Sequence, residues 1–406
     1  MTNPYPPIPS RPQRHHILLA GSDSGSRITA VRRLLALCCA IVLVDTIFYA
    51  ALTPLVPYFN EELGLSKSAV GLLGGAFGAG VLAGAAPGGY LASRAGVRAA
   101  ALVGLALMSL TSIGFALADE TWLLVVTRFV GGFGSALSWV AAFTWLVARA
   151  PEERRGELIG VMLSAAVAGA LLGPAFGSVA AIVGLVPAFA TVSAAGLAIA
   201  LWASFEPAPA PTGGGSLVGA LATIRRPRLL AGLWFLALSP LLFSALTVLV
   251  PLDLAAVGWG AAAVGAVFLV SAGFEALVHP LLGRWTDRSG YRPPVVAGLI
   301  LSMGILLILA WSVNPWLVAV LVVLAGGAFN APLVPGTALF SRGTEKAGLD
   351  QAVAFAITNF AWASGYAVGA PLGGFLADLG GDAVSYVFLT GVCSVTLALV
   401  RRAPKE

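Results

Sequence analysis

The chain has 406 residues, of which 58% are hydrophobic and 10% are charged, and its formal net charge is +5. A soluble domain carries about 25% charged residues, so this composition excludes a water-soluble globular protein. A disordered chain would need low hydrophobicity and high charge, and is excluded too. The mean hydropathy of +0.92 agrees with both exclusions and predicts an integral membrane protein.

The predicted transmembrane segments follow a polar N-terminal stretch. Residues 1–30 contain prolines and arginines, and we expect a disordered cytoplasmic tail there. Twelve apolar stretches come next, each of about 20 residues or more, the length that crosses a bilayer as a helix. They cover residues 34–57, 68–90, 97–117, 121–146, 157–181, 184–204, 229–251, 261–283, 293–312, 315–340, 350–376 and 383–400. Because their hydropathy does not alternate as in barrel strands, they predict an all-α integral membrane fold with twelve transmembrane helices.

The basic residues orient these helices. Every lysine and arginine except Lys67 and Arg128 falls in the two tails or in a loop that follows an even-numbered helix. Since basic residues concentrate on the cytoplasmic side of a membrane, both termini are predicted to be cytoplasmic. The composition is rich in Ala and Gly and has far more Arg than Lys. It is typical of a high-GC bacterium and predicts the plasma (cell inner) membrane.

A solvated linker is predicted to divide the chain into two halves. Residues 205–228 carry Pro-Ala repeats and a Gly-Gly-Gly-Ser run. The predicted domains are a six-helix bundle over 31–204, the linker, a second six-helix bundle over 229–400 and a cytoplasmic tail over 401–406. An internal repeat, in which residues 89–98 resemble residues 283–292, supports this division. Two pseudo-symmetric halves place a transport path at their interface, near the bilayer midplane.

The repeated segment reads G-x-x-x-[DS]-R-x-G-x-R and lies in two predicted cytoplasmic loops. Its glycines allow tight turns, and its arginines can cap helix C-termini or pair with acids. This pair of loops in a six-plus-six chain resembles the major facilitator superfamily, where the motif forms a cytoplasmic gate. The resemblance implies gate residues at Gly89, Ser93, Arg94, Gly96, Arg98, Gly283, Asp287, Arg288, Gly290 and Arg292. Ser93 departs from the family pattern, which usually has Asp there.

Three further stretches resemble the drug:proton antiporter branch of that family. The segment from Arg128 to Gly134 matches R-x-x-x-G-x-G, and Asp45 is followed by the P-x-x-P segment 54–57. The antiporter motif G-x-x-x-G-P-x-x-G is matched by Gly169, Gly173, Pro174 and Gly177. This branch implies proton-coupled export of lipophilic, often cationic compounds. Glycines four residues apart also suit generic close packing of helices, which stays open as the alternative.

Asp45, Arg128 and Glu275 are charged residues well inside predicted helices. Each costs about 2.5–3.5 kcal/mol at a helix centre, so such residues are expected to serve function. A carboxyl in that setting can take up and release a proton or pair with a cationic substrate. By family analogy, Arg128 is expected to set the charge state of a carboxyl, with Asp45 as the candidate partner. The alternative for all three is a static tie between helices.

Seven further residues are candidates for the cavity wall. They share a helix face with a buried acid, place polar and aromatic groups about one turn apart, or, for the residue at 330, lie among glycines and prolines inside a predicted helix. They are Phe48, Tyr49, Ser271, Asn330, Asn359, Trp362 and Tyr366. Packing between helices or against lipid is the alternative for the residues at 359, 362 and 366. His279 is expected to be a packing residue, with a proton relay as its alternative role.

These features predict a proton-coupled secondary transporter that exports lipophilic, including cationic, small molecules by alternating access. A metabolite or sugar symporter or uniporter of the same fold is the alternative, although the predicted helices hold few of the amides and basic residues that a sugar site uses. Motifs for hydrolases, metal sites and ATP binding are absent, so we expect no enzyme, no metal and no cofactor. The expected partners are the substrate, protons and the lipid bilayer, without nucleic acid, and the protein is expected to be a monomer.

Overall fold

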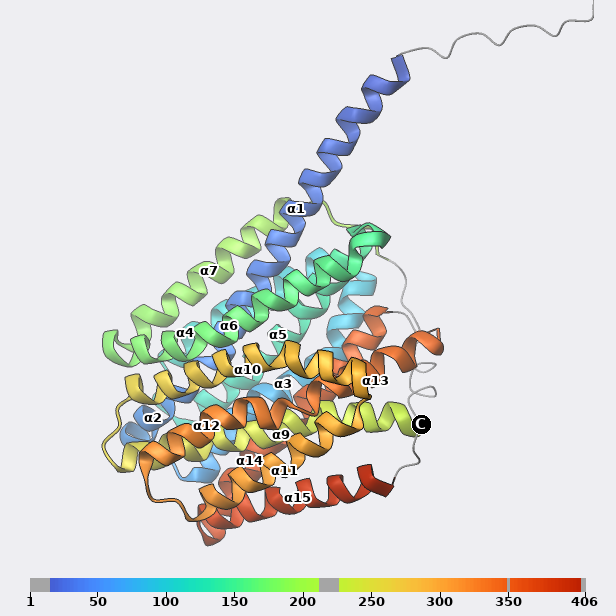
Figure 1. Ribbon diagram of the computed structural model, residues 1–406. Helices are drawn as coiled ribbons and strands as arrows, with labels where there is room; N and C mark the ends of the chain where they lie inside the picture. The colour runs from blue at the N-terminus through green and yellow to red at the C-terminus, as the bar shows by residue number, and fades with distance from the viewer. Residues whose placement is uncertain (1–14, 212–225, 349–350, 403–406) are drawn as a thin grey trace, which may run out of the picture.

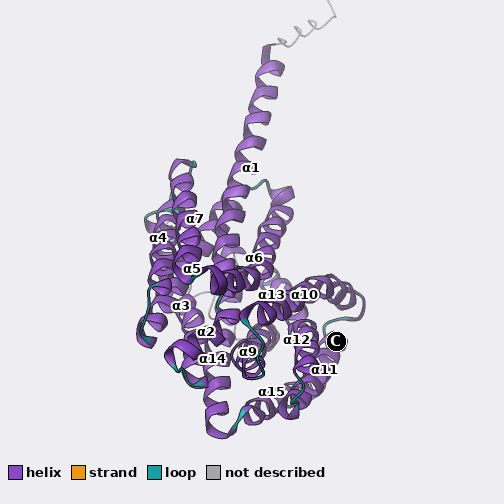
Figure 2. Ribbon diagram, turned by 90° about the vertical axis from the view of Figure 1, so that its left-hand side faces the viewer, coloured by secondary structure: helices purple, strands orange, loops and turns teal. Residues whose placement is uncertain are grey.

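The computed structural model describes residues 15–211, 226–348 and 351–402, and every regular element in these ranges is helical (Figures 1 and 2). The helices run back and forth through one bundle with two halves. The N-terminal half contains α1 His15–Ala50, η1 Thr53–Leu55, α2 Val56–Leu63, α3 Lys67–Arg94, α4 Val97–Ala116, α5 Thr121–Arg149, η2 Glu152–Arg154, α6 Arg155–Val183 and α7 Leu185–Phe205. The C-terminal half contains α9 Pro227–Ala256, α10 Ala261–Ser289, α11 Arg292–Trp311, α12 Pro315–Asn330, α13 Leu333–Lys346, α14 Gln351–Gly380 and α15 Asp382–Arg402.

The twelve-helix membrane fold predicted from the sequence is confirmed. Eleven helical segments among the described residues are long and apolar enough to cross a membrane by length and composition. Two of them are divided by prolines and still count as one span each, namely α1 with η1 and α2, and α12 with α13. The twelfth segment is α14, a 30-residue helix that packs against both α3 and α9.

The first helix begins earlier than the sequence indicated. We expected a disordered tail over residues 1–30, whereas α1 starts at His15 and projects well beyond the rest of the bundle (Figure 1). Its 36 residues contain no proline, and extending a helix adds one hydrogen bond for each residue fixed. Residues 1–14 of the expected tail lie outside the described part of the chain.

Prolines end two of the predicted helices early. The first predicted span, 34–57, stops as a regular helix at Ala50, because Pro54 and Pro57 lack the N–H that would continue it. The predicted span 315–340 divides at Pro332 into α12 and α13 for the same reason. The predicted linker over 205–228 starts and ends close to the observed helix boundaries, and its residues 212–225 lie outside the described ranges.

The two ends of the bundle differ in charge. One end, called here the basic end, carries arginines and lysines at the helix termini: Arg94, Arg98, Arg149, Arg228, Arg292, Lys346 and Arg402. The opposite end, the acidic end, carries Asp119, Glu120, Asp253, Asp378 and Asp382, with Lys67 as its lysine. Because successive transmembrane helices run in opposite directions, the loops after even-numbered spans lie at one end and the loops after odd-numbered spans lie at the other.

Small residues hold the two halves together near the acidic end. The glycine stripe of α3 packs against α14, and a Cβ added at Gly78 would lie 2.8 Å from the backbone nitrogen of Ala367. On the other side of the interface, α6 packs against α10 where Ser178 donates to the carbonyl of Ala261 (3.0 Å). Lipid gives helices no hydrophobic drive to associate, so this close approach of backbones helps to hold the halves in contact.

Candidate transport cavity

A cavity of about 830 Å³ lies between the halves, and both halves line it. Its wall near the middle of the bundle includes the two predicted acids, Asp45 of α1 and Glu275 of α10. From there it extends along α13 to Thr344 and Glu345, close to the basic end. Most of the wall is aromatic or aliphatic. Such a cavity has the size and character of a small-molecule site with a few polar anchors.

Asp45 is held by neutral donors. Its carboxylate oxygen Oδ2 accepts hydrogen bonds from the indole Nε1 of Trp139 (2.7 Å) and from the hydroxyl of Ser135 (2.9 Å). The residue is 3% exposed, and its other oxygen has no hydrogen-bond partner among the described groups. No cationic nitrogen of the described chain forms an ion pair with it. Both groups that donate to it are therefore uncharged.

Arg128 forms no direct ion pair with Asp45, the partner expected from the sequence, although its charge still acts on that carboxylate through space. Its guanidinium donates to the backbone carbonyls of Phe48 and Tyr49, both at 3.3 Å. It also stands over the rings of Phe48 and Phe77, 5.6 and 4.8 Å from their centroids. Because α1 ends at Ala50, the carbonyls of its last turn lack partners within the helix, and a charged donor satisfies two of them. The residue is 1% exposed and lies behind the cavity wall.

Glu275 lies on the cavity wall opposite the N-terminal half. Its Oε1 is 3.5 Å from Nε2 of His279, one turn along α10, and the two side chains are 27% and 26% exposed. His279, which the sequence analysis expected to be a packing residue, is thus half-buried beside an acid. The structure thus places one acid in each half, both facing the same space.

Five of the other wall candidates line the cavity, as predicted. They come from α1, α12 and α14, so both halves contribute to this part of the wall. They are Tyr49, Asn330, Asn359, Trp362 and Tyr366.

Two candidates do not line it. Phe48 is buried among the rings of Phe77, Phe115 and Phe189, because it shares its side of α1 with the packed core. Ser271 is fully buried and donates to the carbonyl of Val322 (2.9 Å), so it ties α10 to α12.

Aromatic residues from opposite halves touch on the acidic side of Asp45. The ring of Tyr49 on α1 lies 5.5 Å from that of Trp362 and 5.0 Å from that of Tyr366, both on α14. The last two stack on each other with an interplanar angle of 12°. This cluster bridges the halves.

Sequence reasoning missed four residues that line the cavity, three on α5 and one on α14. Ser135, Trp139 and Phe143 follow one another at intervals of four residues on α5, and Phe355 lies near the start of α14. The spacing of four was visible in the sequence and predicts one helix face. Nothing in the sequence indicated that this face turns towards Asp45.

The two loops of the repeated motif make contacts within their own halves. In the first, the Ser93 hydroxyl donates to the carbonyl of Tyr90 (2.9 Å), and Arg98 donates to the carbonyl of Glu206. In the second, Asp287 pairs with Arg342 of α13 at 3.3 Å, and both side chains are largely exposed. Gly96 and Gly290 have φ values of +92° and +77°, which only glycine adopts readily. These two glycines therefore allow the tight turns of the two loops.

The predicted antiporter motif packs α6 against α1. A Cβ added at Gly169 would lie 2.6 Å from the carbonyl oxygen of Leu43, and one at Gly173 would overlap Ala50. Pro174, the next residue, lines the cavity. The motif thus brings α6 into backbone contact with the helix that carries Asp45.

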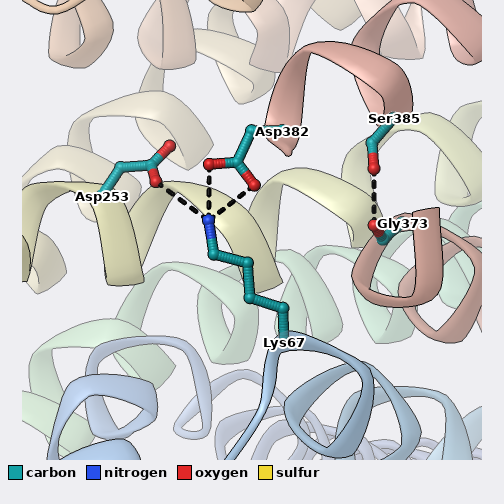
Figure 3. Close-up of polar contacts among 5 residues, drawn as sticks. All are labelled: Lys67, Asp253, Gly373, Asp382 and Ser385. Carbon is teal, nitrogen blue, oxygen red and sulfur yellow. Dashed lines mark hydrogen bonds and ion pairs between the residues drawn. The ribbon is translucent and has the colours of Figure 1, made fainter. Parts of the chain in front are cut away.

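An ion-pair network ties the halves at the acidic end (Figure 3). Nζ of Lys67, at the start of α3, lies 2.6 Å from Oδ1 of Asp382 on α15 and 3.5 Å from Oδ1 of Asp253 on α9. Next to it, the backbone N–H of Ser68 donates to Asp378 (2.8 Å). The start of α15 is fixed in turn by the Ser385 hydroxyl, which donates to the carbonyl of Gly373 (2.6 Å; Figure 3). The lysine of the N-terminal half thus closes this end against two acids of the C-terminal half.

Comparison with known proteins decides the family. The Major Facilitator Superfamily model matches residues 37–254 and again residues 236–406. The chain belongs to the Major Facilitator Superfamily. It is a membrane transporter whose two halves each match the family model, which confirms the family resemblance of the paired loops.

Similar proteins include transporters of different description. An uncharacterized MFS-type transporter, YcaD of Salmonella heidelberg, is 26% identical over 266 residues, or 64% of this chain and 68% of that protein. A multi-drug resistance efflux pump PmrA homologue of Lactococcus lactis is 27% identical over 354 residues, or 81% and 85%. Among solved structures, a bacterial homologue of the human lysosomal transporter Spinster, in an inward-facing and unoccupied conformation, has a TM-score of 0.75. It is 15% identical, and the match covers 92% of this chain and 97% of that one.

Proposed function

We propose that this transporter exports lipophilic small molecules, cations among them, in exchange for protons, with Asp45 as the coupling acid. The observation that carries the proposal is the Asp45 carboxylate, which is buried at the cavity wall and held by two neutral donors. A proton neutralises it, and a cationic substrate neutralises it equally well. Because both compete for one acid, binding of either displaces the other, which is the basis of exchange.

The cavity chemistry supports the substrate class. The cavity wall includes aromatic rings, among them Tyr49, Phe243 and Trp362. Such faces attract cations and bury apolar groups, and the two acids add the charge that a cation needs. A volume of about 830 Å³ holds a drug-sized molecule. The efflux pump homologue of Lactococcus supports the same class.

We further propose that the basic end faces the cytoplasm, so that both termini are cytoplasmic and the described conformation faces inward, with rings of the two halves still in contact on that side. The concentration of arginine and lysine at that end supports this orientation. The cavity extends to Glu345 at the basic end, while the Lys67 network and the α3–α14 packing close the acidic end. Substrate would then enter from the cytoplasm or the inner leaflet and leave after the halves rock about the site.

The other predicted residues have supporting roles in this proposal. Glu275 supplies a second acid for the substrate or for a proton, and Arg128 keeps the end of α1 in place. The cycle would take the form of alternating access in a monomer. The paired loops at the basic end would meet when that end closes.

Proteoliposomes test the proposal. The protein is reconstituted with a pH-sensitive dye inside, a proton gradient is imposed, and lipophilic cations and neutral drugs are added in turn. We expect substrate-triggered proton flux that Asp45→Asn abolishes and Glu275→Gln reduces. The matched control is Asp119→Asn, which removes an exposed acid at the acidic end. Substrate movement without proton flux, equal in all variants, would contradict antiport and favour a uniporter, whereas proton movement in the same direction as substrate would favour a symporter.

A further inference from the structure

An aromatic stack crosses from one half to the other between Asp45 and the basic end. The rings of Phe143 on α5 and Phe355 on α14 are stacked with centroids 3.9 Å apart and an interplanar angle of 5°. The ring of Trp139, one turn earlier on α5, lies 6.2 Å from that of Phe355 at 16°. All three line the cavity. The stack therefore lies on the route from the acid to the basic end.

Trp139 has a second attachment, to the acid itself. Its indole N–H donates to Asp45 at 2.7 Å, while the ring turns towards Phe355. An indole is a rigid plate with one donor, so its position is set by what that donor binds. Hydrogen bonds to an ionised acceptor are roughly twice as strong as those to a neutral one. The charge on Asp45 therefore determines how firmly the indole is held.

We propose that Trp139 transmits the charge state of Asp45 to a gate at the basic side of the cavity, formed by Trp139 and Phe143 of one half and Phe355 of the other. The inference rests on the proposed role of Asp45. With the acid ionised, Trp139 is held and the stack bridges the halves. With the acid neutralised, the indole is released, the stack loosens and the halves separate at the basic end.

One ring of the stack is fixed by packing, and the other two are exposed enough to move. Phe143 is buried in the packing of α5, whereas Trp139 and Phe355 are half-buried and border open cavity. The partner ring belongs to the helix whose other aromatic residues, at 362 and 366, touch Tyr49 on the other side of the acid. Both aromatic bridges thus join α14 to the N-terminal half, and the acid lies between them.

Other ionisable groups near Asp45 are accounted for. Arg128 on α5 is tied to backbone carbonyls, although its charge also acts on Asp45 through space. Tyr49 on α1 and Tyr366 on α14 form the second bridge, and Glu275 on α10 has His279 beside it. None of them is hydrogen-bonded to a member of the stack in the described chain. The direct link between an acid and the stack is the one made by Trp139.

The test measures the separation of the halves at the basic end. Spin labels are placed at Ala148→Cys on α5 and Lys346→Cys on α13, both exposed, with Cys39→Ala removing the half-buried native thiol. Pulsed dipolar distances are recorded in lipid nanodiscs. We expect Asp45→Asn, which mimics the neutral acid, to raise the population with a long distance by about two- to tenfold, the equilibrium shift of one or two aromatic contacts.

Two variants separate transmission from the gate. Trp139→Phe keeps a ring but removes the N–H, and in this background Asp45→Asn should no longer change the distances. Phe355→Leu removes the stack from the other half and should raise the open population with the acid unchanged. The control Trp234→Phe removes an indole that donates to Thr396 away from the cavity, and should leave the response to Asp45→Asn intact.

The outcomes are distinct. If Asp45→Asn shifts the distances equally in the parent protein and in the Trp139→Phe background, Trp139 does not transmit the charge and the proposal is wrong. If Phe355→Leu leaves the distances unchanged, the stack is not a gate and the proposal is wrong as well. The proton-flux assay tests a different point. If proton flux survives Asp45→Asn, the proposed coupling role of Asp45 is wrong, even if Asp45→Asn still changes the spin-label distances in a way that depends on Trp139.

Discussion

The lysine network at the acidic end offers the sharpest prediction about the conformational equilibrium. Replacing Lys67 by Met keeps the length of the side chain but removes the charge that bridges Asp382 and Asp253. The two acids are then left without their cation, and the contact between the halves at this end loses its ionic part. We expect Lys67→Met to favour conformations that are open at the acidic end.

The geometry gives the magnitude. A lysine and a carboxylate about 3 Å apart attract by about 5 kcal/mol at an effective dielectric constant of about 20, before desolvation and ordering are subtracted. Exposed pairs retain only about 0.2–1 kcal/mol of this. Here the side chains are 30%, 35% and 22% exposed, and one cation serves two acids. We therefore expect a net effect of about 1–3 kcal/mol, which shifts a two-state equilibrium about 5- to 150-fold.

Spin labels across the acidic end measure this shift. Glu62→Cys on α2 and Val313→Cys between α11 and α12 lie on opposite halves and are exposed. Lys67→Met should raise the population with long distances, and high salt should reproduce part of the effect in the parent protein. Lys346→Met removes an exposed lysine at the other end and serves as the control.

Charge exchange refines the test. The double variant Lys67→Asp with Asp382→Lys restores an opposite-charge pair across the same contact, so the short distances should return in part. If Lys67→Met leaves the distances unchanged and the exchange has no effect, the network does not hold this end closed. The reasoning from its geometry would then be refuted.

Three further predictions concern packing and the loops. Gly78→Leu should reduce the population that is closed at the acidic end, because the new Cβ would meet the backbone of Ala367. Gly160→Ala is the control, since a Cβ there meets nothing within 4 Å and should leave this population unchanged. The spin labels at positions 62 and 313 measure both effects. Arg128→Lys should lower the thermal midpoint, because two separate guanidinium nitrogens reach the two carbonyls and a lysine has a single nitrogen to place. One buried acceptor left unpaired costs about 1–3 kcal/mol, so an unchanged midpoint in a thermal-shift assay would contradict this role. Asp287→Asn should change the midpoint little, because its pair with Arg342 is exposed, and such pairs contribute less than about 1 kcal/mol.

The sequence predicted the membrane class and the helices because both depend on local composition. A run of about 20 apolar residues must be a helix in lipid, whatever surrounds it. The predicted helix ends were less accurate near prolines such as Pro54 and Pro332, because a proline leaves a carbonyl of the preceding turn without its N–H partner. The early start of α1 at His15 shows the converse, since no residue there stops the helix.

The candidate site was predicted in part. A charge inside an apolar run is visible in one dimension, so Asp45, Arg128 and Glu275 could be found. Their partners could not, because a hydrogen bond between helices depends on the rotation of each helix about its axis. That rotation turned Phe48 into the core and Trp139 towards the acid.

The sequence by itself determined the set of helices and their division into two halves. It also identified the charged residues inside the helices, whose insertion into the membrane costs free energy. Only the tertiary structure decided which of these meet: that Arg128 serves carbonyls instead of Asp45, and that Lys67 reaches two acids of the other half. The physical reason is the range of the interactions. Hydrophobic length acts within one segment, whereas an ion pair or a ring contact needs atoms from distant segments to be within a few ångströms of one another.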